Sequence, residues 1–130
     1  RALSKYHTPG LWANTCCTHP YWNEADVDCA SRRLFEELHL TELHLENRGK
    51  IEYRADVGQG LIEHEVVEIF TSNCANLPKV TPNPEEVMEI RWLDQIELAK
   101  KVKTSPDEFT PWLRIYMLKH FEQISGTITA

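Results

Sequence analysis

Residues 61–69 read Leu61-Ile62-Glu63-His64-Glu65-Val66-Val67-Glu68-Ile69, and this stretch predicts a β-strand. Side chains alternate between the two faces of a strand, so Glu63 and Glu65 share one face with apolar residues. Their Cα atoms stand about 7 Å apart, and burying two carboxylates together without a cation, a proton or open water is costly. The pattern therefore predicts either a metal or acid/base site, or an edge strand with solvated glutamates.

The residues around this strand predict an α/β (mixed α+β) domain. We expect a helix over residues 23–38 with Asn23 as its N-cap, and strands over 43–53, 61–70 and 87–92. A turn should lie at 56–60 and a surface loop at 76–84. Further helices are expected over 93–101 and from Ser105 onward, where Pro106 lies in the first turn. Three helices mixed with strands favour a mixed sheet sandwiched between helices.

Composition fits one folded domain over residues 1–130. Hydrophobic residues make up 42 % of the chain, with 5 Gly and 7 Pro, close to the globular average. The balance of 14 Lys+Arg against 20 Asp+Glu gives a net charge of -6, the wrong sign for neutralising nucleic-acid phosphates. The best apolar run, residues 112–118, is interrupted by Arg114, so we expect no membrane span.

The cysteines and the first residue bear on where the protein works. Cys16, Cys17, Cys29 and Cys74 form no C-x-x-C motif and no dense framework of the secreted kind, which favours a reducing cytoplasm. The chain opens with Arg1 rather than Met and has no signal-peptide profile. We therefore expect the natural protein to begin before Arg1.

A second candidate site lies in Thr15-Cys16-Cys17-Thr18-His19-Pro20. It places a thiol two residues from an imidazole, a pairing that serves a nucleophile, a general base or a metal ligand. The spacing alone favours a buried structural cysteine beside a satisfied histidine. The other histidines show no metal-ligand spacing such as H-E-x-x-H.

The expected first helix carries charged residues in a recognisable register. Arg32 with Glu36, and Arg33 with Glu37, are i,i+4 pairs that could simply line a solvated face. The register also resembles the Nudix box, the helical signature with which diphosphate-handling enzymes hold divalent metal: the matching residues are Glu24, Arg32, Leu34, Glu36, Glu37 and Leu40. Thr18 and His39 stand in place of box glycines and Arg33 in place of a glutamate, and the last change argues against a standard pyrophosphohydrolase.

Several motifs together give a more specific resemblance. They are Arg1-Ala2-Leu3-Ser4-Lys5, the segment from Pro9 to Pro20 with its W-x-N-x-x-C-x-H-P element, Glu36-Glu37-Leu38, Tyr53-Arg54-Ala55, Glu63-His64-Glu65 and Pro111-Trp112. In order and spacing they resemble type 1 isopentenyl diphosphate isomerase over essentially the whole chain. The resemblance implies a Nudix-type fold and, in isoprenoid biosynthesis, the interconversion of isopentenyl and dimethylallyl diphosphate through a tertiary carbocation.

The resemblance also implies catalytic roles. Glu65, with Tyr53 nearby, would deliver a proton to the alkene, and Cys17 would accept another from the opposite face. Trp112 matches the aromatic residue that lies over the cation, where cation–π attraction could contribute about 1–2 kcal/mol in a desolvated site.

Metal and substrate contacts follow from the same resemblance. His19, Glu63 and Glu65 match a metal site suited to Mn²⁺ or Mg²⁺, with Zn²⁺ as another occupant. Glu37 matches the residue that holds a second Mg²⁺ on the substrate diphosphate, and Arg1 and Lys5 match cationic diphosphate contacts. Two further histidine ligands of the family precede Arg1, and no positions here correspond to them.

The expected partner is thus a small-molecule diphosphate, with neither nucleic acid nor membrane involved. We expect a monomer, with association if a covering N-terminal segment is missing. Two alternatives stay open: a diphosphate hydrolase of the same fold, and a non-catalytic scaffold that keeps the fold.

Overall fold

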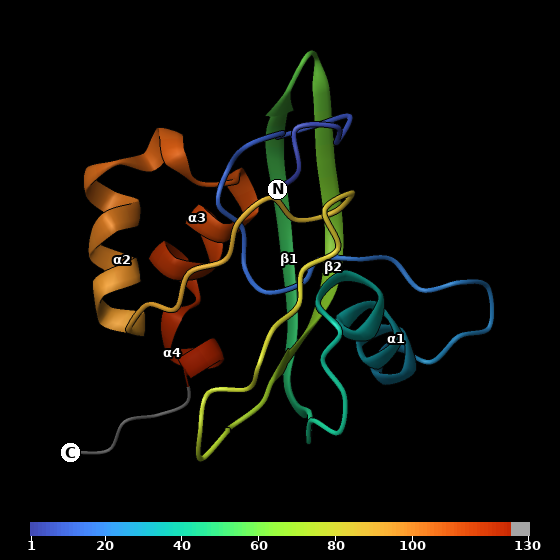
Figure 1. The fold of residues 1–130 in the computed structure, drawn as a ribbon. Coiled ribbons are helices and arrows are strands. Elements are labelled where there is room, and N and C mark those ends of the chain that lie inside the picture. Colours follow the sequence, from blue (N-terminus) through green and yellow to red (C-terminus); the bar gives the residue numbers. More distant parts are fainter. Residues whose placement is uncertain (126–130) are drawn as a thin grey trace.

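The computed structural model describes residues 1–125 and contains one β-hairpin with helices packed against it (Figure 1). The elements follow in the order α1 (Asp26–Leu38), β1 (Glu46–Gly58), β2 (Leu61–Thr71), α2 (Gln95–Thr104), the 3₁₀ turn η1 (Pro106–Glu108), α3 (Pro111–Lys119) and α4 (Phe121–Ser125). The predicted mixed α+β class is confirmed. The two named strands pair antiparallel, and a single parallel bridge joins Trp12 to Phe109.

The hairpin register brings the glutamates of β2 opposite the buried side chains of β1. Tyr53 pairs with Glu65 and Ala55 with Glu63. Gln59 and Gly60 connect the strands with positive φ angles of 54° and 74°, the backbone of a two-residue hairpin turn that favours glycine. The predicted strand over 61–70 is confirmed, whereas β1 begins and ends later than the predicted 43–53.

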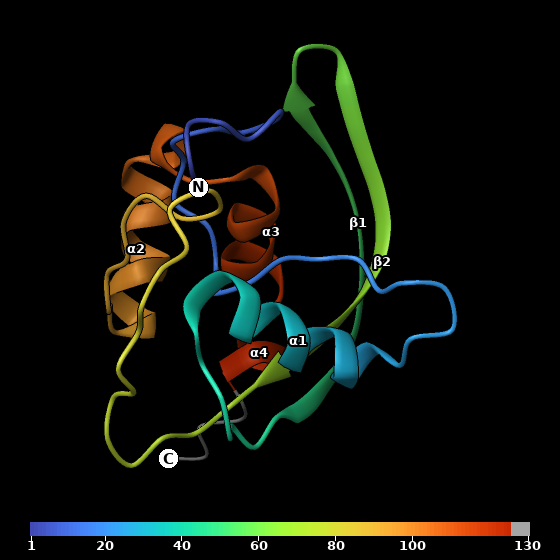
Figure 2. The same cartoon turned by 45° about the vertical axis from the view of Figure 1, so that its right-hand side comes forward.

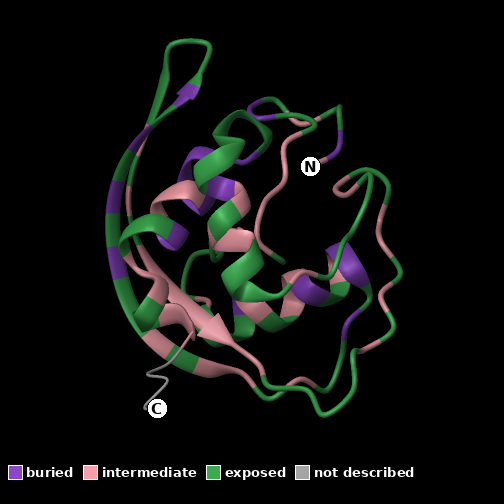
Figure 3. Cartoon of the chain, turned by 90° about the vertical axis from the view of Figure 1, so that its left-hand side faces the viewer, coloured by how far each residue is buried: buried purple, intermediate pink, exposed green. Residues whose placement is uncertain are grey.

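Burial alternates along β1, as expected for a strand with one covered face. Ile51, Tyr53, Ala55 and Val57 are buried, and the residues between them are exposed. Figures 2 and 3 show the hairpin curving around the helices, which all lie on its inner side. Helices were expected on both faces of the sheet; among the described residues they cover one face only.

The main hydrophobic core joins the inner face of β1 to α3. Trp112, Leu113 and Tyr116 of α3 are buried against the β1 side chains, with Phe109 beside them. Thr110 caps α3 because its hydroxyl accepts a hydrogen bond from the Leu113 amide, and Pro111 occupies the first helical position. The predicted last helix therefore exists but is divided, with Pro106 in the short turn η1 before α3.

The start of α1 differs from the prediction. Asn23 has a positive φ of 64° and is not the N-cap; Ala25 takes that position without a side-chain cap. Asp26 and Asp28 lie in the first turn, where acidic side chains complement the positive end of the helix dipole. The helix ends at Leu38, and the φ of 54° at its C-cap, His39, explains why the box has glycine at that position.

The long connection between β2 and α2 contains no named strand in the described residues. The predicted strand over 87–92 is wrong, because this segment has no neighbouring strand with which to pair. Instead the connection supplies hydrogen bonds to the open carbonyls at the end of α1: Thr81 N donates to Leu38 O and Asn83 N to Glu37 O. The connection thereby lies against α1, and the loop expected at 76–84 forms part of it.

The helix predicted over 93–101 is confirmed as α2, slightly shifted, with Asp94 capping its first turn. Within residues 1–125 no helix has both the length and the apolar character that crossing a bilayer requires.

Candidate active site

The two glutamates of β2 converge on one hydroxyl. Tyr53 Oη on β1 lies 3.0 Å from Glu63 Oε2 and 3.3 Å from Glu65 Oε2. Burial raises the pKa of Tyr53, and the nearby Tyr116, Glu63 and Glu65 add to this effect. The phenol therefore stays protonated and donates a hydrogen bond to a carboxylate. The hairpin register thus produces a compact group of one buried phenol and two acids.

His19 reaches the same group from the segment before α1. Its Nε2 lies 2.8 Å from Glu65 Oε1, although its side chain is 75 % exposed. His7 Nε2 lies 3.5 Å from Glu63 Oε1, and the His7 side chain is mostly buried. In the described part of the chain no three His, Cys, Asp or Glu side chains are already placed to hold a metal ion.

Cys17 contacts the core beside this group. Its Sγ lies 3.2 Å from Asn14 Oδ1, and burial raises the thiol pKa to about 12. Cys17 packs against the main core, whereas Cys16 packs against the second core of Leu34, Leu38 and Leu40. The two adjacent thiols therefore face different clusters, and Cys17 is protonated at neutral pH.

Trp112 closes one side of the site. Only 2 % of its surface is exposed, and its Nε1 donates to Asn14 Oδ1 at 3.1 Å. The His7 ring meets it edge-on at 5.8 Å, and the Arg1 guanidinium carbon lies 5.2 Å from its ring centroid. Arg1 Nε is buried and has no hydrogen-bond partner within residues 1–125, so this cation retains a donor for an anionic ligand.

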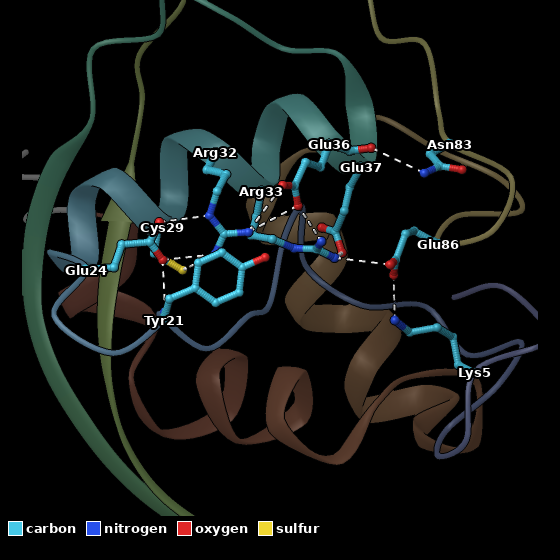
Figure 4. A network of polar contacts seen from close by, with 10 residues as sticks. All are labelled: Lys5, Tyr21, Glu24, Cys29, Arg32, Arg33, Glu36, Glu37, Asn83 and Glu86. Carbon is cyan, nitrogen blue, oxygen red and sulfur yellow. Dashed lines mark hydrogen bonds and ion pairs between the residues drawn. The ribbon is translucent and has the colours of Figure 1, made fainter.

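A second charged group surrounds the end of α1 (Figure 4). Glu37, which is buried, accepts from Arg33 Nη2 at 2.9 Å, and the same nitrogen lies 3.2 Å from Glu86 Oε1. Glu86 Oε2 in turn binds Lys5 Nζ at 2.5 Å. The carboxylate expected to hold Mg²⁺ and the lysine expected to contact the diphosphate are thus joined through Arg33 and Glu86.

The other box residues have a structural role. Arg32 binds Glu24 at two points, 2.8 and 2.9 Å, and its guanidinium lies 3.8 Å from the Tyr21 ring centroid. The i,i+4 contacts of Arg32 with Glu36 and of Arg33 with Glu37 are also present. The contact between Arg32 and Glu24 therefore holds the segment before α1 against the helix.

The structure brings the predicted site residues into two groups. Tyr53, Glu63, Glu65 and His19 form direct contacts, and Cys17, Trp112 and Arg1 lie against the same core. Lys5 and Glu37 belong to the charged group at α1. The roles assigned to these residues stay predictions.

Sequence reasoning gave no role to four residues at these groups: Asn14, His7, Glu86 and Tyr116. The Tyr116 ring centroid lies 5.8 Å from that of Tyr53, and its position at helical spacing from Trp112 and Leu113 indicates a core residue and not a site residue. His7 and Glu86 carry no recognisable spacing. Asn14 is the one with a signal, because it is the asparagine of the W-x-N-x-x-C-x-H-P element.

Comparison with known proteins places this arrangement in a family. The family model described as NUDIX domain matches residues 1–113. A protein of Dinoroseobacter shibae named Isopentenyl-diphosphate Delta-isomerase is 61 % identical over 98 % of this chain and 73 % of its own length. The chain belongs to the isopentenyl-diphosphate Delta-isomerase family of Nudix proteins.

Other members of the family agree. Proteins with the same name from Cereibacter sphaeroides strain KD131 and Rhodobacter capsulatus are 59 % and 52 % identical, over 98 % and 100 % of this chain and 72 % and 74 % of their own lengths. The family membership predicted from the motifs is confirmed.

Proposed function

We propose that this chain interconverts isopentenyl diphosphate and dimethylallyl diphosphate by adding one proton to the alkene and removing another from C2. The observation that carries the proposal is the contact of the buried Tyr53 hydroxyl with Glu63 and Glu65, in a core that also includes Trp112 and Cys17. An alkene is a very weak base, so its protonation needs an oriented acid in a site that excludes water. The names of the relatives support the same chemistry.

Glu65 and Cys17 are the proposed proton-transfer groups. The protonated Glu65, oriented by Tyr53, adds the proton at the terminal alkene carbon, and the Cys17 thiolate removes one from C2. That reaction leaves a Cys17 thiol and a Glu65 carboxylate. Before the next forward turnover Cys17 must give its proton to solvent and Glu65 must take one up, and the raised pKa of Cys17 opposes the first of these transfers. In the reverse reaction the same two groups exchange roles, since the forward and reverse reactions pass through the same transition states in opposite order.

Trp112 is the proposed neighbour of the positive charge that develops between these steps. Its ring already has the Arg1 guanidinium 5.2 Å from its centroid, so its environment is compatible with a cation. An indole face attracts positive charge electrostatically but is a weak nucleophile, and it does not trap the intermediate.

A divalent metal fits the donor set of the acidic group. The Tyr53 hydroxyl lies within 3.3 Å of both carboxylates, so their oxygens converge, and His19 adds a nitrogen donor. We propose that His19, Glu63 and Glu65 hold Mn²⁺ or Mg²⁺, with Zn²⁺ as another occupant. When bound, the metal supplies positive charge that neutralises the paired acids.

The diphosphate is proposed to bind between Arg1 and the charged group at α1. Arg1 supplies a cation with an unused donor, Lys5 a second cation, and Glu37 a buried carboxylate for Mg²⁺ on the diphosphate. A monomer in the cytoplasm stays our prediction for assembly and location, and sedimentation tests the first part.

Turnover in D₂O tests the proposal. The chain is incubated with isopentenyl diphosphate and Mg²⁺, and NMR is used to follow dimethylallyl diphosphate and the deuterium in its new methyl group. We expect both signals in the wild type and in Cys74→Ala, which alters an exposed cysteine, and neither in Glu65→Gln. Release of phosphate or pyrophosphate without formation of dimethylallyl diphosphate would favour the hydrolase. Failure to bind isopentenyl diphosphate in the presence of Mg²⁺ would favour the non-catalytic scaffold.

A further inference from the structure

The side-chain amide of Asn14 lies between two of the proposed catalytic side chains. Its Oδ1 is 3.2 Å from Cys17 Sγ and 3.1 Å from Trp112 Nε1, and its Nδ2 is 3.1 Å from the Cys16 carbonyl oxygen. The Asn14 amide therefore joins its own segment to Trp112, which is 98 residues away in sequence.

The partners fix the orientation of this amide. An indole N–H only donates and a backbone carbonyl only accepts, so the Asn14 oxygen must face Trp112 and its nitrogen must face Cys16. Turning the amide over would break both bonds. The Asn14 oxygen that accepts the hydrogen bond from the indole N–H also accepts one from the Cys17 S–H. This second bond directs the sulfur lone pairs away from Asn14.

Asn14 contacts one partner that lies outside regular secondary structure and one that lies in a helix. Cys17 lies in a segment without helix or strand, so side-chain contacts determine where its sulfur points. Trp112 is in the first turn of α3, with His7 and Arg1 against its ring. We propose that Asn14 is a positioning residue that holds the Cys17 thiol and the Trp112 indole in one fixed relation; this inference rests on the proposed function.

Asn14→Leu tests the proposal because leucine has a similar volume and makes none of the three bonds. We expect kcat to fall by about tenfold or more, the scale of a small misplacement of reacting groups. KM should stay within about twofold, since within residues 1–125 the Asn14 side chain hydrogen-bonds neither Arg1 nor Lys5. Asn14→Asp keeps an oxygen at the same place and should restore part of kcat.

An indole N–H spectrum supplies a readout that a general loss of stability would not move. The chain has 4 tryptophans, and Trp112→Phe identifies the resonance of Trp112. In Asn14→Leu this resonance should shift upfield and exchange faster with water, while the other three stay in place; in Asn14→Asp it should stay near its wild-type position. Asn47→Leu, at an exposed position of β1, is the matched control and should change neither kcat nor the Trp112 resonance.

An unmoved Trp112 resonance in Asn14→Leu would overturn the proposal, as would wild-type kcat or a rise in KM that accounts for the lost activity. Asn14→Ser, which shortens the side chain without adding apolar bulk, gives the same test if the leucine variant does not fold. A wild-type chain without isomerase activity would contradict the proposed function, whereas the resonance tests the Asn14 contact without turnover.

Discussion

Arg32 and Glu24 bind each other at two points, with Nε 2.8 Å from Oε2 and Nη2 2.9 Å from Oε1. The Tyr21 amide also donates to Glu24, and the Tyr21 ring stacks on the guanidinium. This contact joins the segment that carries His19 to α1.

We therefore expect Glu24→Gln to lower the melting temperature with an effect that depends on pH. Hydrogen bonds from Arg32 and the Tyr21 backbone lower the Glu24 pKa from 4.5 to about 2. A lowered carboxyl pKa in the folded state stabilises the fold above 4.5, and this stabilisation is lost as the pH falls toward 2. Melting curves should show the full difference between variant and wild type above pH 5 and a smaller one near pH 3. A difference that does not change with pH would contradict this account.

Arg33→Glu, which restores the box glutamate, should destabilise the chain. Arg33 neutralises Glu36, Glu37 and Glu86, with contacts of 2.6, 2.9 and 3.2 Å. A fourth carboxylate there would face three others at the partly buried end of α1. We expect a loss of at least about 1 kcal/mol in the free energy of unfolding, measured by urea denaturation.

Arg33→Gln is the control for that experiment, because it removes the positive charge without adding a negative one. It should fall between the wild type and Arg33→Glu. Equal stability of all three proteins would mean that the charge of Arg33 does not stabilise the fold through Glu36, Glu37 and Glu86.

The sequence predicted local elements better than their assembly. The period of two in β2 identified the shared face of Glu63 and Glu65, because strand geometry alone determines it. Residues 87–92 alternate in the same way but have no strand neighbour, and pairing depends on contacts far apart in sequence. Similarly, Asn23 suits an N-cap by residue type, yet the chain reaches α1 through a left-handed residue there.

The same limit applies to the site. The family resemblance singled out Cys17, Tyr53 and Trp112, but the sequence offered no means to see that the Asn14 amide contacts both Cys17 and Trp112, the latter 98 residues from Asn14. The pKa of Cys17 also depends on burial, which the fold determines and local sequence does not.

Mn²⁺ added to the chelated chain should raise its melting temperature, because a cation relieves the repulsion between Glu63 and Glu65. Three protein ligands should bind the metal weakly. We therefore expect the melting temperature to keep rising with metal concentration instead of reaching a plateau at one equivalent. Glu63→Gln keeps an acceptor for Tyr53 and should lose most of the shift. Glu68→Gln, on the same strand, should respond like the wild type; equal shifts in both variants would place the metal elsewhere.

The two adjacent thiols should differ in function. Cys17→Ala is expected to lose most isomerase activity while keeping its fold, because Cys17 matches the proton-transfer position and packs against the core that contains Tyr53 and Trp112. Cys16→Ala should be mild, since Cys16 packs in the second core, toward Leu34 and Leu38. An inactive, folded Cys16→Ala variant would show that the roles belong to the other thiol.

Alkylation of Cys17 without substrate should be slow and should accelerate with pH. Burial raises its pKa from 9.0 to about 12, and only the thiolate reacts. Below that pKa the thiolate fraction rises about tenfold for each pH unit, so the rate should climb from pH 7 to 10 without a plateau. Exposed Cys74 should be alkylated faster than Cys17 in the same sample, and mass spectrometry of peptides separates the two sites. A plateau for Cys17 below pH 9 would mean that the free enzyme already stabilises the thiolate, which would make Cys17 a base before substrate arrives.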